Sequence, residues 1–329
     1  MLEDDWNMFI TSGELDINIR NNEDTFNENI PKASELYIST KTKIVYLTNK
    51  NIDLNELFWD IHIMPYNTSE NGIIKKQMKF ISNNKCDLDY IKNKCSKYEI
   101  VDEYVIQHVE QEQGDNIMYK DVRKISIGIS NKDLLSQRSK KKSAFYNSLV
   151  IILRLFYDNT FKEVHIKVFN TGKLEIPGVQ NEGLFLKSVH YVCDLLKKLY
   201  KKSVDIGNIE TVLINSNFEC NYCINRSKLF DILKTQHNLN VSYDPCSYPG
   251  IQCKYNIPNT DITLSFMIFR TGSVLIVGKC EEDTIYKVHE FIKKILYDEY
   301  INIHEDYKLP EKNKDKKKYF KTKTLYFKN

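Results

Sequence analysis

The stretch VFNTGKLEIPG at residues 168–178 decides the fold, because residues 268–278 repeat its pattern as IFRTGSVLIVG. Residues 166–200 align with residues 266–300 without a gap. The turn glycines and the apolar positions keep the same register, which predicts an internal structural repeat. The matched pairs are Phe169 with Phe269, Thr171 with Thr271, Gly172 with Gly272, Ile176 with Ile276, Gly178 with Gly278, Leu196 with Leu296 and Tyr200 with Tyr300.

Each copy predicts a strand, a tight turn, a second strand and a helix. Apolar and other residues alternate with period two on both sides of the turn, which places the two sets on opposite faces of a sheet. Apolar residues then recur at helical spacing over residues 185–199 and 285–295, as expected for an amphipathic helix that covers one face. The sequence therefore predicts an α+β fold of two similar units, each an antiparallel sheet with a helix on one face.

The opposite sheet face in the second copy carries Met267, Phe269, Leu275 and Val277. An uncovered apolar face of this kind indicates a binding partner. The alternative is that the N-terminal segment or an insertion covers it. The periodicity leaves both interpretations open.

Composition gives few functional signals. With 329 residues, 42% of them hydrophobic, the chain can form one large or two ordinary domains. It has no apolar run of membrane-spanning length, and the acidic start MLEDDWNMFI lacks a signal-peptide pattern, so we expect an intracellular protein. The Cys220–Cys223 pair, with Cys246 and Cys253, fits zinc-ribbon spacing poorly, so we expect core thiols rather than a metal site.

Charge is unevenly distributed along the chain. Residues 311–329 hold eight lysines and two acids, a net charge of +6, within a total of +3, so the rest carries −3. A nucleic-acid-binding domain is usually basic, and this core is not. The tail has the composition of a solvated end. The run RSKKK at residues 138–142 is a solvated loop or a contact to flanking DNA or a polymerase subunit.

Together these segments resemble the TATA-box-binding protein (TBP) family. KVFNTGKLEIPGV and MIFRTGSVLIVGK are similar to its strand–turn–strand segment, and CEEDTIYKVHEFIKKIL to its second long helix. YDPCSYPGIQCKY (243–255) and NIDLNELFWDIHIMPYN (51–67) are similar to a strand start in the second repeat and to the helix region of the first. The abundance of Lys, Ile and Asn and the long insertion look like the divergent forms encoded by large nucleocytoplasmic DNA viruses.

The resemblance implies a pseudo-symmetric duplicated saddle, a curved antiparallel sheet with helices on its convex face. We expect an N-terminal extension at residues 1–35, repeat 1 at 36–205, repeat 2 at 206–300 and a basic tail at 301–329. A small α/β lobe is inserted in repeat 1 at about residues 81–144, with a helix in 86–98 and strands in 103–111 and 122–130.

The function implied by the resemblance is transcription initiation. The family binds and bends A/T-rich promoter DNA through the minor groove, and a factor-IIB-like protein or RNA polymerase subunits would be recruited. We expect a monomer without cofactor, metal or membrane contact, in the host cytoplasm or nucleus at sites of viral transcription, or packaged in the virion. The sequence contains no Walker loop, HExxH motif or nucleophile elbow, so no motif of this kind indicates an enzyme. The alternative is a TBP-fold protein-interaction module with little or no DNA binding.

The same resemblance implies site residues, position by position. Phe169, Phe269 and Tyr248 fall on wedge positions that insert between base steps. The fourth wedge falls on Asn71 by local motif, or on Phe145 or Tyr146 if residues 149–155 and 163–169 form a hairpin. The remaining expected DNA contacts are the apolar Met267, Leu275 and Val277, the amide of Asn215, and Lys167, Lys173 and Lys279.

Repeat 1 departs from the family pattern on this face. Lys167 replaces an apolar contact, and Glu175 and Pro177 replace Val and Thr. A carboxylate facing the groove floor would meet base acceptors and nearby phosphates. We therefore expect repeat 2 to be the better DNA half.

Overall fold

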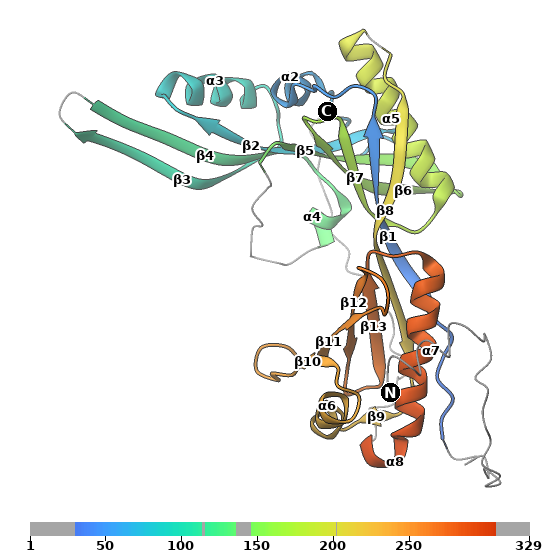
Figure 1. Ribbon diagram of the computed structural model, residues 1–329. Helices are drawn as coiled ribbons and strands as arrows, with labels where there is room; N and C mark the ends of the chain where they lie inside the picture. Colours follow the sequence, from blue (N-terminus) through green and yellow to red (C-terminus); the bar gives the residue numbers. More distant parts are fainter. Residues whose placement is uncertain (1–29, 114–115, 136–145, 202, 307–329) are drawn as a thin grey trace. The chain divides into compact units, whose positions relative to one another are not determined.

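The computed structural model describes residues 30–113, 116–135, 146–201 and 203–306. Within these residues the chain divides into two compact units, drawn in Figure 1. The repeat-1 unit holds residues 42–210, and the repeat-2 unit holds residues 30–41 with 211–306. Two long strands, β1 (Tyr37–Leu47) and β8 (Ile206–Glu219), contribute residues to both units.

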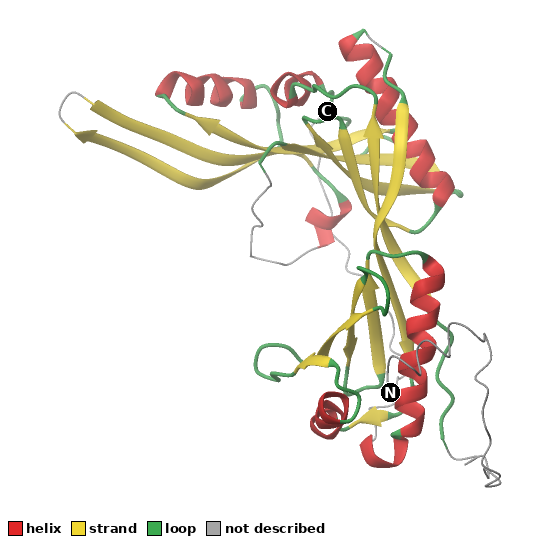
Figure 2. Ribbon diagram, in the orientation of Figure 1, coloured by secondary structure: helices red, strands yellow, loops and turns green. Residues whose placement is uncertain are grey.

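In the repeat-2 unit the strand order is β10-β11-β12-β13-β8-β1. Helix α7 (Glu282–Asp298) covers one face and buries Ile285, Val288 and Ile292. Figure 2 shows the long helix beside its strands. The remaining elements are α6 (Arg226–Thr235), α8 (Tyr300–Ile303), β10 (Asn240–Ser242), β11 (Ile251–Asn256), β12 (Thr263–Ile268), β13 (Ser273–Gly278) and the small pair β9 (Cys223–Ile224) with β14 (His304–Glu305).

In the repeat-1 unit the order is β8-β1-β7-β6-β5-β2-β4-β3. Helix α5 (Glu182–Tyr200) buries Phe185, Val189 and Val192 against this sheet. The Asn181 side chain caps the helix by accepting from the Leu184 amide at 3.0 Å. The other elements are α2 (Leu54–Asp60), α3 (Lys85–Cys95), α4 (Asn131–Leu135), β2 (Gly72–Ser82), β3 (Val101–Gln113), β4 (Asn116–Gly128), β5 (Ser148–Tyr157), β6 (Thr160–Phe169) and β7 (Lys173–Val179).

The insertion contains the expected helix and strands, and its strands continue the sheet of the repeat-1 unit. β4 pairs with β2 from Lys75 opposite Gly128 to Ser82 opposite Asp121, and β3 pairs with β4 as a long hairpin. Helix α3 packs on the same side as α2, through buried Ile91 and Cys95. The insertion therefore widens the sheet of repeat 1.

The repeated Thr-Gly has a steric cause. Gly172 and Gly272 have φ values of +77° and +81°, where L-residues are strained. A Cβ would lie 2.0 Å from the Asn49 carbonyl oxygen in one copy and 2.2 Å from that of Tyr222 in the other. Each turn thus packs against the backbone that follows the first strand of its own repeat. The predicted α+β class is confirmed in both units. Within the described residues, no helix is long and apolar enough to cross a membrane.

Candidate nucleic-acid interface

We call the sheet face opposite α5 or α7 the open face of each unit. On the open face of repeat 2, Met267 lies opposite Leu275, and Ser265 lies opposite Val277. Residues directly opposite on antiparallel strands share a face. Met267, Leu275 and Val277 are half-buried and lie outside the hydrophobic core cluster of the unit. Together these three residues form an apolar strip.

An aromatic pair ends this strip. The rings of Tyr248 and Phe269 lie 5.9 Å apart, tilted by 58°. A Cβ on Gly250 would lie 3.0 Å from the Phe269 ring and 3.2 Å from the Tyr248 ring, so glycine is what allows both rings to approach the backbone here. The Tyr248 amide donates to the Asp244 carbonyl oxygen at 2.9 Å, which fixes the preceding turn. The structure thus brings together two of the three assigned wedge positions.

Polar residues flank the strip along β8. Asn215 lies opposite Val277, and Asn217 lies opposite Leu275. The Asn215 side-chain amide donates to the Thr40 hydroxyl at 3.2 Å. Asn217 was missed by the sequence analysis, although its i, i+2 spacing from Asn215 on one strand was the available signal. Lys279 is exposed directly after β13.

The open face of repeat 1 carries an ion pair at the matching place. Lys167 lies opposite Glu175, and their Nζ and Oε1 atoms are 2.6 Å apart. These two positions correspond to Met267 and Leu275. The Glu175 carboxylate is therefore compensated by a neighbouring ammonium group, but the pair must lose water when anything docks on it, and that desolvation opposes binding.

The inserted segment covers part of this same face. The Asn131 amide, at the start of α4, donates to both carboxylate oxygens of Glu163 on β6 at 3.0 and 3.1 Å. Asp133 of α4 pairs with Lys75 of β2 at 2.7 Å. Ile152, on β5 between them, is only 3% exposed although it lies on the open face, opposite Lys75 and His165. Helix α4 therefore occupies the centre of the open face of repeat 1.

The pKa shifts of the residues beneath α4 agree with their burial. Burial lowers the pKa of the His165 imidazole and raises the pKa of the Glu163 carboxyl. For Asp133, burial raises the pKa, but the hydrogen bonds from Lys75 and Ser130 outweigh it, and the net pKa is lowered. The ion pair between Asp133 and Lys75 thus persists at neutral pH.

The hairpin register shows which residue of repeat 1 is equivalent to Tyr248 of repeat 2. Leu149 pairs with Val168 in repeat 1, as Ile251 pairs with Ile268 in repeat 2. Tyr146 precedes Leu149 by three residues, just as Tyr248 precedes Ile251. Tyr146 is 56% exposed.

The competing position, Asn71, lies at the far end of β5. Its side-chain oxygen accepts from the Phe156 amide at 2.6 Å, whereas Phe169 pairs with Ser148 at the near end. The β5–β6 hairpin interpretation is therefore confirmed. Phe145, the other candidate, lies outside the described residues.

The two aromatic residues of repeat 1 at candidate wedge positions, Tyr146 and Phe169, each have a lysine over the ring. Lys79 Nζ lies 3.6 Å from the centroid of Tyr146, and Lys173 Nζ lies 5.2 Å from that of Phe169. An ammonium group over an aromatic face is attracted by the ring quadrupole. The wedge positions of repeat 1 are thus more positive than those of repeat 2.

The cysteines mostly lie in the core. Cys220, Cys223 and Cys253 are buried, and burial raises the pKa of the Cys253 thiol to about 12. Cys246 is exposed, so the prediction of a core thiol is wrong there, because it lies in the turn after Asp244. Among the described residues, no three His, Cys, Asp or Glu side chains gather in a way that could hold a metal ion.

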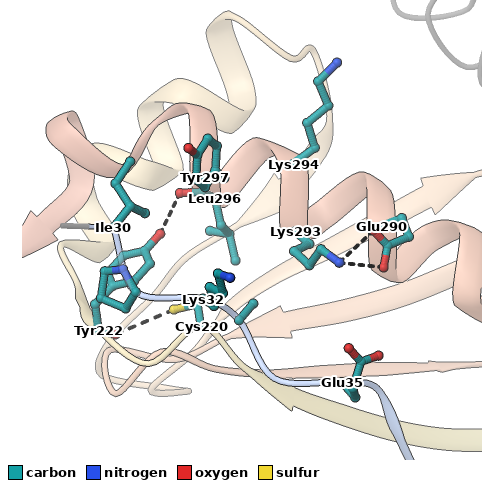
Figure 3. A pocket seen from close by; sticks show the side chains of 12 residues that line it. Ile30, Lys32, Glu35, Cys220, Tyr222, Glu290, Lys293, Lys294, Leu296 and Tyr297 are labelled. Carbon is teal, nitrogen blue, oxygen red and sulfur yellow. Dashed lines mark hydrogen bonds and ion pairs between the residues drawn. The ribbon is translucent and has the colours of Figure 1, made fainter. Parts of the chain in front are cut away.

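A separate hollow lies on the helix side of repeat 2. Its volume is about 430 Å³, and it lies between residues 30–35 and the second half of α7. Figure 3 shows the side chains that line it. The Tyr222 hydroxyl donates to the Leu296 carbonyl oxygen at 2.7 Å, and Lys293 pairs with Glu290 at 2.7 Å. None of the residues assigned to DNA contact lines it.

Comparison with known proteins relates the second repeat to the TATA-binding proteins. Residues 208–298 match the family model described as transcription factor TFIID, or TATA-binding protein (TBP). The chain is 24% identical over 294 residues to a TATA-box-binding protein-like protein of Acanthamoeba polyphaga mimivirus, covering 79% of this chain and 76% of that one. It is 25% identical over 128 residues to the TATA-box-binding protein of Sulfolobus acidocaldarius, covering 39% of this chain and 59% of that one.

A solved structure, the Methanococcus jannaschii TBP, aligns at a TM-score of 0.40 with 15% identity, over 80% of this chain and 97% of the other. The match to the family model spans β8 to α7, the elements that build repeat 2 and its apolar strip. Residues 208–298 therefore carry a domain of the TATA-binding protein family, and the chain is similar over most of its length to a viral TATA-box-binding protein-like protein.

Proposed function

We propose that this transcription-related protein binds and bends A/T-rich promoter DNA through the minor groove, with repeat 2 as the leading half. The observation that carries the proposal is the apolar strip of Met267, Leu275 and Val277, ended by the ring pair of Tyr248 and Phe269. A half-exposed apolar strip needs a partner surface. Apolar wedges that unstack a base step are the recognised way to bend DNA from the minor groove.

The polar groups around the strip fit the same partner. Asn215 and Asn217 present side-chain amides beside Val277 and Leu275. The floor of an A/T minor groove offers only acceptors, adenine N3 and thymine O2, which amide N–H groups can satisfy. Lys279, exposed at the end of β13, is placed to contact phosphate. The site therefore favours A/T over G/C pairs.

Repeat 1 contributes less in this proposal. Its wedge residues Phe169 and Tyr146 remain, supported by Lys173 and Lys79. Its centre is covered by α4, and Lys167 is engaged with Glu175. Repeat 1 would thus anchor one end of a bend whose groove contacts come mainly from repeat 2.

The partners follow from the proposed role. A monomer on a bent promoter would recruit a factor-IIB-like protein or RNA polymerase subunits, inside the infected cell at sites of viral transcription. The protein acts by binding rather than by catalysis.

The test is a gel shift combined with a bend measurement on A/T-rich and G/C-rich duplexes of equal length. We expect binding and bending of the A/T-rich duplex that weaken steeply with salt, because phosphate contacts release counterions. Failure to bind at low salt, where electrostatic attraction is strongest, would refute the proposal.

A protein-interaction module is the second candidate. The cover of α4 and the Lys167–Glu175 pair favour it, because both reduce the groove-facing apolar area of repeat 1. This candidate predicts copurification with polymerase subunits and no DNA affinity at low salt, so the same gel shift separates the two.

A further inference from the structure

The hollow on the helix side of repeat 2 lies where the described part of the chain begins. Ile30, the first described residue, lines it together with the three residues that follow. The Ser34 amide donates to the Glu219 carbonyl oxygen at 2.7 Å. The Asn221 side chain donates to the Lys32 carbonyl oxygen at 2.7 Å, so both contacts hold this stretch beside the end of β8. The chain that precedes Ile30 therefore starts at the rim of the hollow.

Buried apolar side chains line the hollow (Figure 3). Tyr222 and Leu296 are 7% and 2% exposed, and the Tyr222 hydroxyl is already satisfied by the Leu296 carbonyl oxygen. Tyr297 lines the same space and is 44% exposed. A volume of about 430 Å³ falls within the roughly 300–1,000 Å³ of small-ligand pockets. The hollow can therefore take an aromatic side chain.

The charged residues around the hollow carry a net charge of +1. They are three lysines and two glutamates, namely Lys32, Lys293, Lys294, Glu35 and Glu290. Lys293 pairs with Glu290 at 2.7 Å, and Lys32 is exposed. Coulomb attraction at this rim favours an acidic segment over a basic one.

The segment before Ile30 has this composition. Residues 1–29 hold eight acidic residues and one arginine, a net charge of −7. Counting back from Ile30, Phe26 is the first apolar residue, and acidic residues flank it at positions 23, 24 and 28. Four residues extend over at most about 14 Å, so Phe26 is near enough to the rim to enter the hollow.

We infer that residues 23–29 of this chain dock along the second half of α7, with the Phe26 ring in the hollow and the acidic residues beside Lys32. Burial of one aromatic ring drives the docking, while the entropy lost by ordering residues 27–29 opposes it. The segment then lies on the helix side of repeat 2 and leaves the open face uncovered. The inference is independent of the proposed function, because none of the residues assigned to DNA contact lines the hollow.

The experiment measures amide hydrogen exchange in the full chain by mass spectrometry. Phe26→Ala is compared with wild type. Phe9→Ala is the matched control, because it removes the same ring from the same acidic segment at a greater distance from Ile30. We expect Phe26→Ala to accelerate exchange roughly fivefold at residues 30–35 and 290–297, and Phe9→Ala to leave exchange there unchanged.

A second pair of variants tests the charge. Lys32→Glu repels the acidic segment, whereas Lys287→Glu changes the net charge equally at an exposed position of α7 that does not line the hollow. We expect Lys32→Glu to accelerate exchange at residues 290–297, and Lys287→Glu to leave it unchanged. High salt should reduce the difference between Lys32→Glu and wild type, because it screens charges at the surface.

Three outcomes would overturn the inference. The first is unchanged exchange in Phe26→Ala, and the second is an equal acceleration in Phe26→Ala and Phe9→Ala. The third is protection that disappears when the wild-type protein is strongly diluted, because the segment would then come from a second copy of the chain. Exchange is measured without DNA, so failure of the proposed function would leave these results unaffected.

Discussion

Repeat 1 and repeat 2 use the same hairpin for different surfaces. In repeat 2, Met267 and Leu275 leave an apolar strip, while in repeat 1, Lys167 and Glu175 form an ion pair at the same two positions. The pattern of strand and helix survives both choices, because the residues that face the helix remain apolar in each copy. The core thus preserves the fold, while the open face is able to diverge.

The largest expected difference between the repeats lies at the wedges. Phe269→Ala should weaken binding of an A/T-rich duplex by about a hundredfold, near the upper end of the stacking energy for an aromatic ring on a base. Phe169→Ala should cost about tenfold, since repeat 1 is the weaker half. Titration by fluorescence anisotropy measures both. Equal losses of affinity in the two variants would contradict the proposal that repeat 2 is the stronger DNA-binding half.

Exchanging the central pair should have the next largest effect. Met267→Lys with Leu275→Glu places the ion pair of repeat 1 in repeat 2, where docking must desolvate it, and should weaken DNA binding by roughly tenfold. The reverse exchange, Lys167→Met with Glu175→Leu, should strengthen binding or leave it unchanged. A loss in the reverse variant would show that the ion pair itself contacts the ligand.

The repeat-1 core should also respond differently to pH. Lys76 is fully buried; its ammonium group donates to the Ile61 carbonyl oxygen at 2.8 Å. Burial lowers its pKa from 10.5 to about 8. Above pH 8 the folded state is neutral while the unfolded state still binds a proton, so stability rises with pH. We expect Lys76 to contribute a gain of about 1 kcal/mol between about pH 8 and 9, measured in urea unfolding as the difference between wild type and Lys76→Met.

The reference for this effect is Lys76→Met, which lacks the titrating amine but keeps the thiols. The reference is needed because burial raises the pKa of Cys95 to about 11 in this unit and that of Cys220 to about 11 in the other. Thiols in the unfolded chain, with an ordinary pKa of 9.0, already lose protons in this window and lower the stability of both proteins as pH rises. An unchanged slope in the Lys76 variant would exclude this lysine as the cause.

The smallest expected effect concerns the cover of repeat 1. Asp133→Asn removes the charge that pairs with Lys75 and should loosen α4, so that amide exchange at residues 131–135 accelerates. A half-exposed ion pair is worth up to about 1 kcal/mol, so DNA binding should improve by no more than about fivefold. Weaker DNA binding would indicate that α4 contributes to the interface instead of masking it.

The resemblance between the two hairpins was enough to predict α5 and α7, the turn before each of them and the core residues that they bury. Phe185, Val189, Val192 and Leu196 are buried on α5 at the predicted spacing, and the same holds for α7. Local patterns of this kind are readable because they follow the geometry of one helix or one strand. The position of Asn217 beside the apolar strip was missed, because the resemblance supplied a single groove asparagine.

Other features depended on pairing between distant segments. The equivalence of Tyr146 with Tyr248 follows only from the register of β5 with β6, and no local pattern distinguished Tyr146 from Asn71 as the proposed fourth wedge. The junction of β4 with β2 likewise joins residues 39 to 53 positions apart in the sequence, from Ser82 with Asp121 to Lys75 with Gly128. Such pairings depend on chain closure and on the packing of the whole sheet.

The sequence by itself determined the duplicated α+β unit, the covered face of each sheet and the aromatic residues at Phe169 and Phe269. The tertiary structure alone decided what lies on each open face: α4 over the centre of repeat 1 and the half-exposed strip on repeat 2. The physical reason is that exclusion of water selects apolar residues at the buried positions of each helix or strand, and this pattern can be recognised within a single element. The occupant of an open face depends on contacts such as Asn131 with Glu163 and Lys75 with Asp133, which form between distant parts of the folded chain.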